Sequence, residues 1–146
     1  MIFIQPDLRY HPICHRCQTP AQTVHTQGRR RVVFDLNMAS VCTWLDVEYR
    51  KIWCPQCDKV RVEHLSFCDA GKRVTHRLAR YIHDLCKSMT IKEVAKRFDL
   101  HHTTVKDIDK SFLEEEFEQT DYTHLRILAF DEIALKKGHN YMTVVL

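Results

Sequence analysis

The sequence predicts an α+β fold built from several modules in series along its 146 residues. Two Cys-x-x-Cys pairs enclose a segment of alternating apolar residues, which is typical of strands. The next segment repeats apolar residues every three or four positions, as helices do. Two apolar runs around Lys-Lys-Gly-His then predict a β-hairpin. We place the three modules at residues 1–68, 69–120 and 121–146.

Two features of the sequence argue against a membrane-spanning protein and against a secreted one. No apolar run approaches the roughly 20 residues that a membrane span needs. The first residues lack the basic start, long apolar stretch and cleavage site of a signal peptide. We therefore expect a cytoplasmic protein with no membrane partner. Four of the seven cysteines form two Cys-x-x-Cys pairs, a pattern that in a reducing compartment favours metal binding over disulfides.

The charge of the chain is distributed unevenly around a small net value of +3. Residues 1–68 carry nine basic and six acidic side chains, and residues 69–110 carry ten and six. Residues 111–146 reverse the balance, with three basic and seven acidic side chains. Two basic segments followed by an acidic one predict that the N-terminal part of the chain binds nucleic acid.

The two cysteine pairs predict a structural Zn²⁺ site. Each pair can form a tight turn with both thiolates on one side, and two such knuckles supply four tetrahedral ligands: Cys14, Cys17, Cys54 and Cys57. A closed site of this kind leaves no coordination position for chemistry. The alternatives are unliganded cysteines or a thioredoxin-like redox pair, which the absence of a βαβ pattern disfavours. The other three cysteines are expected as core or surface thiols.

The segment between the knuckles predicts three strands. Residues 22–26 and 31–35 are expected to form a hairpin whose turn is residues 27–30. Its basic tip, formed by Arg29, Arg30 and Arg31, can contact phosphate, although a solvated turn is the alternative. Residues 41–53 predict a long strand that leads to the second knuckle, as in a zinc ribbon. Its alternation assigns one face to Val41, Thr43, Leu45, Val47, Tyr49 and Trp53.

Residues 72–88 predict an amphipathic helix with a basic exposed side. Its apolar residues recur at helical spacing, and they are Val74, Leu78, Tyr81, Ile82 and Leu85. The basic side comprises Lys72, Arg73, Arg77 and Arg80.

Residues 90–110 predict a helix-turn-helix. Thr90 can cap the first helix, with Glu93 as the reciprocal partner of a capping box. Asp99 and Leu100 form the turn, where Asp tolerates the left-handed conformation better than most residues do. The buried faces are assigned to Val94, Ala95 and Phe98 in the first helix, and to Val105, Ile108 and Phe112 in the second.

The exposed start of the second helix is where contacts to double-stranded DNA are expected. The candidate side chains are His101, His102, Thr103, Lys106 and Lys110, with Asp107 among them. The alternative is a plain helical hairpin within a bundle, which the basic neighbours and the zinc module disfavour.

The last module begins after an acidic run and predicts a strand, a turn and a second strand. Asp131 directly follows the apolar run of residues 127–130. A carboxylate on a buried strand is costly unless it is exposed, paired or bound to a metal. Asp131 is thus a candidate metal ligand, and a simple surface Asp is the alternative.

The order of these parts resembles bacterial insertion-sequence transposases with an N-terminal four-cysteine zinc finger, a helix-turn-helix and a DDE catalytic core. The resemblance rests on the paired Cys-x-x-Cys, on Met-Thr-Ile-Lys-Glu-Val-Ala at residues 89–95, and on Asp-Glu-Ile-Ala-Leu-Lys-Lys-Gly-His-Asn-Tyr at residues 131–141. It implies that residues 121–146 open an RNase-H-like domain, and that Asp131 is the first acid of the catalytic triad. The implied chemistry is phosphoryl transfer on DNA with two Mg²⁺ ions.

The resemblance also implies that this chain corresponds to a truncated N-terminal fragment of such a transposase, because the family's second Asp and its Glu lie further along. We expect binding to the terminal inverted repeats of an insertion sequence and association with the nucleoid. Strand transfer, Mg²⁺ binding and a homodimer are expected only of a full-length form. The alternatives are a zinc-containing helix-turn-helix transcription regulator and a non-functional remnant.

Overall fold

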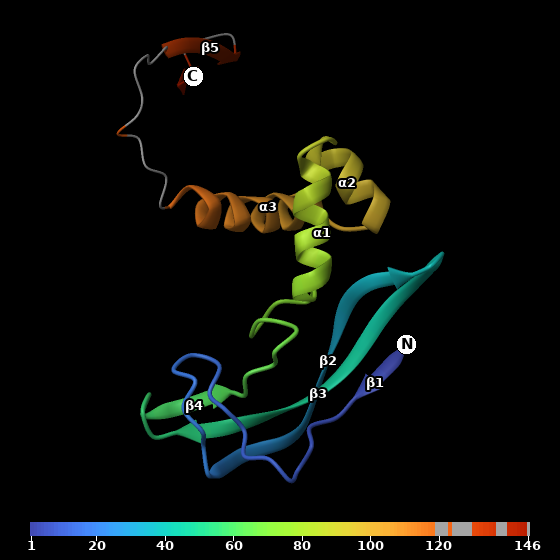
Figure 1. The fold of residues 1–146 in the computed structure, drawn as a ribbon, viewed down its shortest axis with the longest axis vertical. Helices are drawn as coiled ribbons and strands as arrows, with labels where there is room; N and C mark the ends of the chain where they lie inside the picture. Colours follow the sequence, from blue (N-terminus) through green and yellow to red (C-terminus); the bar gives the residue numbers. More distant parts are fainter. Residues whose placement is uncertain (119–122, 124–129, 137–139, 146) are drawn as a thin grey trace. The chain divides into compact units, whose positions relative to one another are not determined.

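The computed structural model describes residues 1–118, 123, 130–136 and 140–145 (Figure 1). The chain divides into two compact units, Met1–Phe112 and Leu113–Leu146. The described residues confirm an α+β fold with a mixed sheet and helices. None of the helices in the described part of the chain combines the length and apolar character that a membrane crossing requires.

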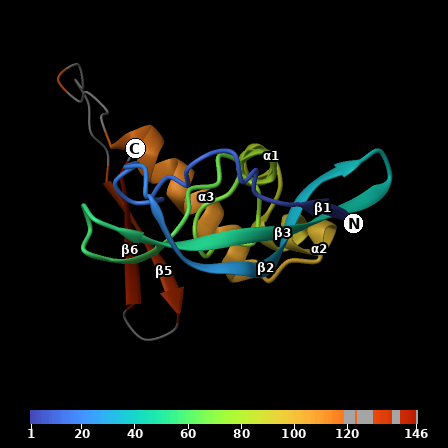
Figure 2. The ribbon, with the colours of Figure 1, turned by 90° about the horizontal axis from the view of Figure 1, so that it is seen from below.

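A mixed four-stranded sheet forms the first half of the larger unit. Its central strand is β3 (Val41–Cys54), and β2 (Thr23–Met38) pairs antiparallel along one edge of it. On the other edge, β1 (Ile2–Ile4) runs parallel to β3, and β4 (Lys59–Val62) pairs antiparallel with its end. The strands β2 and β3 therefore run side by side for most of their length (Figure 1, Figure 2).

The predicted hairpin around residues 27–30 is wrong, because β2 passes through these residues without turning. Gly28 adopts a φ of 70° and lies within the register shift of the β2–β3 ladder between Thr26 and Arg29. A glycine within a strand marks a bulge as readily as a turn, and here it accommodates the irregularity. The true turn is at Ala39 and Ser40, between the paired residues Met38 and Val41. The three arginines after Gly28 consequently lie within a strand instead of at a tip.

The long strand predicted at residues 41–53 is confirmed as β3, but its apolar face is only half right. Leu45 and Val47 are buried as the alternation requires, whereas Trp53 is 42% exposed. Beyond Tyr49 the opposite face is covered, so that Ile52 and Cys54 are buried instead. The strand keeps its period of two, but a different part of the chain covers it at each end.

Three helices complete the larger unit and lead into the smaller one: α1 (His76–Cys86), α2 (Ile91–Phe98) and α3 (His102–Phe117). Helix α1 begins later than the periodicity predicts, because the Thr75 side chain caps it by accepting a hydrogen bond from Leu78 N. The residues just before Thr75 lie along β2 instead. Phe34 N donates to Arg73 O at 2.7 Å, and Thr75 N donates to Phe34 O at 3.0 Å.

The core of the helices includes one strand residue. Phe34 of β2 packs among the buried side chains of the helices, which are Leu78, Ile82, Val94, Ala95, Phe98 and Val105. Next to it, the buried Asp35 accepts hydrogen bonds from the Thr75 hydroxyl and from the Arg77 guanidinium. Strand β2 thus joins the sheet to the helices, although the sheet also has two separate core clusters of its own.

The smaller unit contains an antiparallel hairpin of β5 (Phe130–Lys136) and β6 (Asn140–Val145). This confirms the two predicted strands and their antiparallel pairing at the level of the backbone. The predicted Lys-Gly-His turn at residues 137–139 and most of the predicted linker lie outside the described residues. The expectation that this hairpin opens an RNase-H-like domain stays a prediction.

Candidate metal centre and nucleic-acid interface

The four cysteines singled out by their spacing come together at one end of the sheet. The sulfur atoms of Cys14, Cys17, Cys54 and Cys57 all lie within 4.8 Å of one another. The Cys17 and Cys54 sulfurs are 3.4 Å apart, and those of Cys14 and Cys57 are 4.0 Å apart. Tetrahedral zinc with bonds of about 2.3 Å requires sulfur separations of about 3.8 Å. The cluster can therefore hold a metal ion of that size.

Two similar turns position the four sulfurs. In the first, Cys14 N donates to Thr19 O at 2.9 Å and Gln18 N donates to Cys14 O at 3.0 Å. In the second, Cys54 ends β3 and pairs with Lys59 at the start of β4. Each turn has a left-handed residue directly after its second cysteine, with φ values of 57° at Gln18 and 48° at Asp58. Each Cys-x-x-Cys therefore forms the knuckle that its spacing predicts.

The thiols of the cluster differ in acidity. Burial raises the pKa of Cys54 to about 12 and also raises the pKa of Cys57. Hydrogen bonds from Thr19 lower the pKa of Cys17 to about 6. Because thiolates are the metal ligands, a bound metal would have to displace protons from the more basic thiols. Metal loading is therefore expected to weaken as the pH falls.

A buried ion pair that the sequence analysis missed stabilises this cluster. Arg50 of β3 and Glu63 are both at least nine-tenths buried, and the Arg50 guanidinium lies 2.7 Å from the Glu63 carboxylate. Glu63 also accepts a hydrogen bond from Arg50 N at 2.6 Å, and its backbone forms a bridge with Cys14. The signal in the sequence was weak, since alternation assigns Arg50 to the polar face of β3. That face becomes covered at this end of the strand.

The structure of the helix-turn-helix agrees closely with the prediction from the sequence. The Thr90 and Glu93 capping box is present, and Asp99 ends α2 in the left-handed conformation at a φ of 52°. Leu100 N donates to Ala95 O at 2.9 Å, which closes the turn. Buried Val105 then seats α3 against the core. The predicted motif is therefore confirmed in the cap of α2, in its turn and in the buried residues of α2. In α3, Val105 is buried as predicted, whereas Ile108 and Phe112 are only partly buried.

The DNA contacts predicted for the helix-turn-helix lie on the surface of α3 or at its start. The exposed side chains are His101, His102, Thr103, Lys106 and Lys110. Thr103 N donates to His101 Nδ1 at 3.4 Å, so His101 covers one of the first amides of the helix. Thr103, Lys106 and Lys110 recur at three- and four-residue spacing and therefore share one face of α3.

A second pair that the sequence analysis missed fixes α3 against α1. Fully buried His83 of α1 lies with its Nδ1 2.8 Å from the Asp109 carboxylate of α3. The His83 ring also stacks on Phe112 with centroids 5.0 Å apart, and Arg80 lies over the same ring. His83 stands at a core position of the helix, where its polar character gives no hint of the partner.

Known proteins similar to this chain agree with these features. Residues 63–113, which include α1 and α2 and most of α3, match the helix-turn-helix domain of transposase family ISL3. The chain is 37% identical over 145 residues to the transposase for insertion sequence element IS1001 of Bordetella parapertussis. Both similarities are to insertion-sequence transposases. The match covers 99% of this chain and 35% of the Bordetella protein. No solved structure matches the chain.

The remaining predicted site residues belong to strands instead of α3. Arg29, Arg30 and Arg31 follow one another in β2, where Arg30 is already paired with Asp46 and Glu48 at 2.9 and 3.8 Å. Asp131 lies in β5, opposite Val144 of β6. The surroundings of its side chain are outside what the structure describes.

Proposed function

We propose that this chain is a DNA-binding part of an insertion-sequence transposase that binds the terminal inverted repeats of its element. The observation that carries the proposal is the capped helix-turn-helix, in a segment that matches a transposase helix-turn-helix family. Helix α3 would enter the major groove, with Thr103, Lys106 and Lys110 toward the DNA. His101 and His102 would contact it from the start of the helix.

The proposed metal of the cysteine cluster is a structural Zn²⁺ ion. Sulfur separations of 3.4 and 4.0 Å and four thiol ligands support zinc over metals that prefer oxygen ligands. The ion would hold residues 1–68 as a zinc-ribbon-like module. Residues 69–120 would be the DNA-binding domain, although the two share the core around Phe34.

The proposed role of the last module, residues 121–146, is to begin an RNase-H-like catalytic domain. Asp131 would supply the first of three carboxylates that hold two Mg²⁺ ions for strand transfer. One carboxylate cannot build that site, so this activity and a homodimeric assembly are proposed for a full-length transposase only. A cytoplasmic, nucleoid-associated location follows from the proposed partner.

The test is a binding measurement on duplexes that carry the ends of the encoding element. Fluorescence anisotropy would compare these ends with scrambled duplexes of equal length and with promoter DNA of the neighbouring genes. We expect the terminal duplex to bind at least about 1,000-fold more tightly than scrambled DNA at physiological salt. Equal affinity for all three would overturn the proposal, and preference for a promoter would favour a transcription regulator.

A matched pair of variants tests whether α3 makes the contact. Lys106→Ala removes an exposed charge from α3, and Lys59→Ala removes one from β4. If Lys106 contacts a phosphate, its variant should reduce the salt dependence of binding by about one unit of slope, while Lys59→Ala leaves the slope unchanged. Identical slopes for the two variants would exclude Lys106 from the interface.

A further inference from the structure

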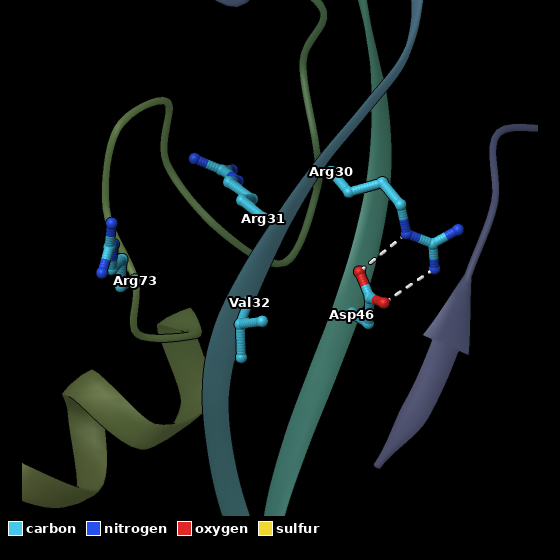
Figure 3. Close-up of a pocket in the computed structure, with 5 residues that line it drawn as sticks. All are labelled: Arg30, Arg31, Val32, Asp46 and Arg73. Atoms are coloured by element: carbon cyan, nitrogen blue, oxygen red, sulfur yellow. Dashed lines mark hydrogen bonds and ion pairs between the residues drawn. The ribbon is translucent and has the colours of Figure 1, made fainter.

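A pocket of about 470 Å³ lies beside β2, outside the helix-turn-helix. It is lined by Arg30, Arg31, Val32, Asp46 and Arg73 (Figure 3). Three arginines and one carboxylate give this pocket a positive balance, which favours an anionic ligand. The three arginines differ, however, in whether their charge is already compensated.

The charge of Arg30 is compensated within the protein. Its Nε donates to Asp46 Oδ1 at 3.0 Å, and a terminal nitrogen lies 2.9 Å from Asp46 Oδ2. Glu48 contributes a second carboxylate at 3.8 Å. Figure 3 shows Arg30 turned toward Asp46, on the opposite side of β2 from Arg31 and Arg73. Arg30 therefore forms a structural ion pair between β2 and β3.

The charge of Arg31 has no such compensation in the part of the chain that the structure describes. Its guanidinium lies over the Tyr49 ring at 5.6 Å and 3.7 Å from the sulfur of Cys68. Burial raises the pKa of Cys68, so this thiol stays neutral and does not offset the charge. The Arg31 Nε is buried without a hydrogen-bond partner. A partly desolvated cation in this state gains from a nearby anion.

Arg73 brings a second cation to the same side of β2 from the segment before α1 (Figure 3). Its side chain is exposed, and no carboxylate among residues 1–118 pairs with it. Its backbone is nevertheless fixed, because Phe34 N donates to Arg73 O at 2.7 Å. The sulfur of Cys68 also lies 3.4 Å from Lys72 O. Arg31 and Arg73 thus line the same pocket, and the backbone that carries Arg73 is held in place before any ligand arrives.

We propose that Arg31 and Arg73 form a phosphate-binding site for the DNA backbone, separate from the contacts of α3. The inference rests on the proposed DNA binding and adds a second point of contact to it. Guanidinium groups bind phosphate oxygens through paired N–H donors, which a lysine cannot reproduce. The contact reads no bases, so it strengthens binding to every sequence and fixes the position of the duplex.

The test compares Arg31→Gln and Arg73→Gln with Lys59→Gln, which removes an equal charge from exposed β4. Binding to terminal and scrambled duplexes is measured by anisotropy from low to high salt. Each arginine variant should weaken binding to both duplexes alike and reduce the slope of log K against log salt by about 1. The Lys59→Gln variant should keep the slope of the unaltered protein.

One further variant and one further measurement control for the loss of charge alone and for the loss of folding. Arg73→Lys keeps the positive charge but lacks the paired N–H donors of the guanidinium group. It should recover the slope of log K against log salt but only part of the DNA affinity. Thermal unfolding of each variant shows whether folding is intact. This concern applies mainly to Arg31, since the Arg73 side chain is exposed. If Arg73→Gln and Arg31→Gln fold and keep the slope of the unaltered protein, the proposed site is wrong.

A free phosphate offers the same chemistry as the DNA backbone, and a second arm separates the two. Inorganic phosphate is titrated against the unaltered protein and Arg73→Gln at constant ionic strength. Tight, Arg73-dependent binding of phosphate together with unchanged DNA slopes would reassign the site to a free anion and overturn the proposal. If the unaltered protein binds no DNA, the proposed function itself fails. If it binds DNA but the arginine variants behave like Lys59→Gln, only this inference fails.

Discussion

The two ends of the larger unit are stabilised in different ways. At the cysteine end, the buried core consists of Cys14, Ala21, Ile52 and Cys54, so half of its members are thiols. At the helical end, seven buried residues from β2 and the three helices form an apolar core. A core of four mostly small residues buries little apolar surface, so we expect it to depend on metal coordination. The difference implies that metal removal should act on one end first.

The largest expected effect comes from removing one ligand of the cluster. Cys54→Ser should abolish stoichiometric zinc binding and unfold the cysteine end, because structural zinc contributes apparent free energies of about 10–16 kcal/mol. The helical core should remain folded, with weaker protection of the β2 amides from hydrogen exchange. Zinc content by mass spectrometry and hydrogen exchange along the chain measure both effects.

The control for this experiment is Cys42→Ser, since Cys42 is exposed and outside the cluster. It should leave both zinc content and exchange unchanged. Full zinc occupancy in Cys54→Ser would show that the cluster is not a four-cysteine site. Loss of protection across all three helices would instead show that the two ends fold as one.

A smaller effect is expected from the ion pair that braces the cysteine end. Glu63→Ala leaves the Arg50 charge buried without its partner, which should cost about 3–5 kcal/mol of unfolding free energy. Glu48→Ala removes a carboxylate from the more open pair with Arg30 and should cost less than about 1 kcal/mol. Urea unfolding with zinc present measures both, and equal losses would contradict the bracing role of Glu63.

The hydrogen bonds of Asp35, which join the sheet to the helices, should make the unfolding free energy depend on pH in the acid range. Hydrogen bonds from Arg77 and Thr75 lower the pKa of Asp35 below its ordinary value of 3.8. A lowered pKa contributes stability above the unfolded value, and this stability is lost as the pH falls through the folded value. The unfolding free energy should therefore decline below about pH 4 as Asp35 becomes protonated.

Asp35→Asn supplies the comparison for that decline. The variant should lose about 2 kcal/mol at neutral pH, as expected for hydrogen bonds to a charged group, and should depend less on pH below 4. Denaturant unfolding at pH 7, 4 and 3 provides the measurement. A parallel decline in the variant and the unaltered protein would assign the acid sensitivity to other carboxylates.

The smallest expected effect lies wholly in the helical end. Thr90→Ala removes the cap of α2 and should cost about 1 kcal/mol. Ser111→Ala removes a hydroxyl that donates to Ile108 O within α3, and it should be neutral or slightly stabilising. If chelation of zinc lowers the stability of Thr90→Ala further than that of the unaltered protein, the two ends are more strongly coupled than their cores suggest.

Local chemistry in the sequence was sufficient for the two cysteine knuckles and for the cap and turn of the helix-turn-helix. A Cys-x-x-Cys pair and a Thr-x-x-Glu box act over four residues, so their spacing alone predicts the knuckles and the cap of α2. The left-handed Asp99 was predictable for the same reason. These features need no knowledge of the rest of the fold.

Features that depend on distant segments were not predictable in the same way. The exposure of Trp53 depends on which part of the chain covers the end of β3. The pairings of His83 with Asp109 and of Asp35 with Arg77 join residues 26 and 42 positions apart. Gly28 permits either a turn or a bulge, and the β2–β3 pairing decides between them. The alternation of polar and apolar residues carries no information about any of these partners.

The segment before α1 also limits how the molecule can associate with copies of itself. Strand β2 is an outer strand of its sheet, and a long outer strand with free amides invites pairing with the same strand of another molecule. At Phe34, residues 73–75 already use the outward amide and carbonyl, and the irregular stretch around Gly28 is followed by three arginines. Blocked hydrogen bonds, distorted pairing and like charge together oppose sheet extension between molecules. Loosening this segment would therefore be expected to promote aggregation even where every helix remained intact.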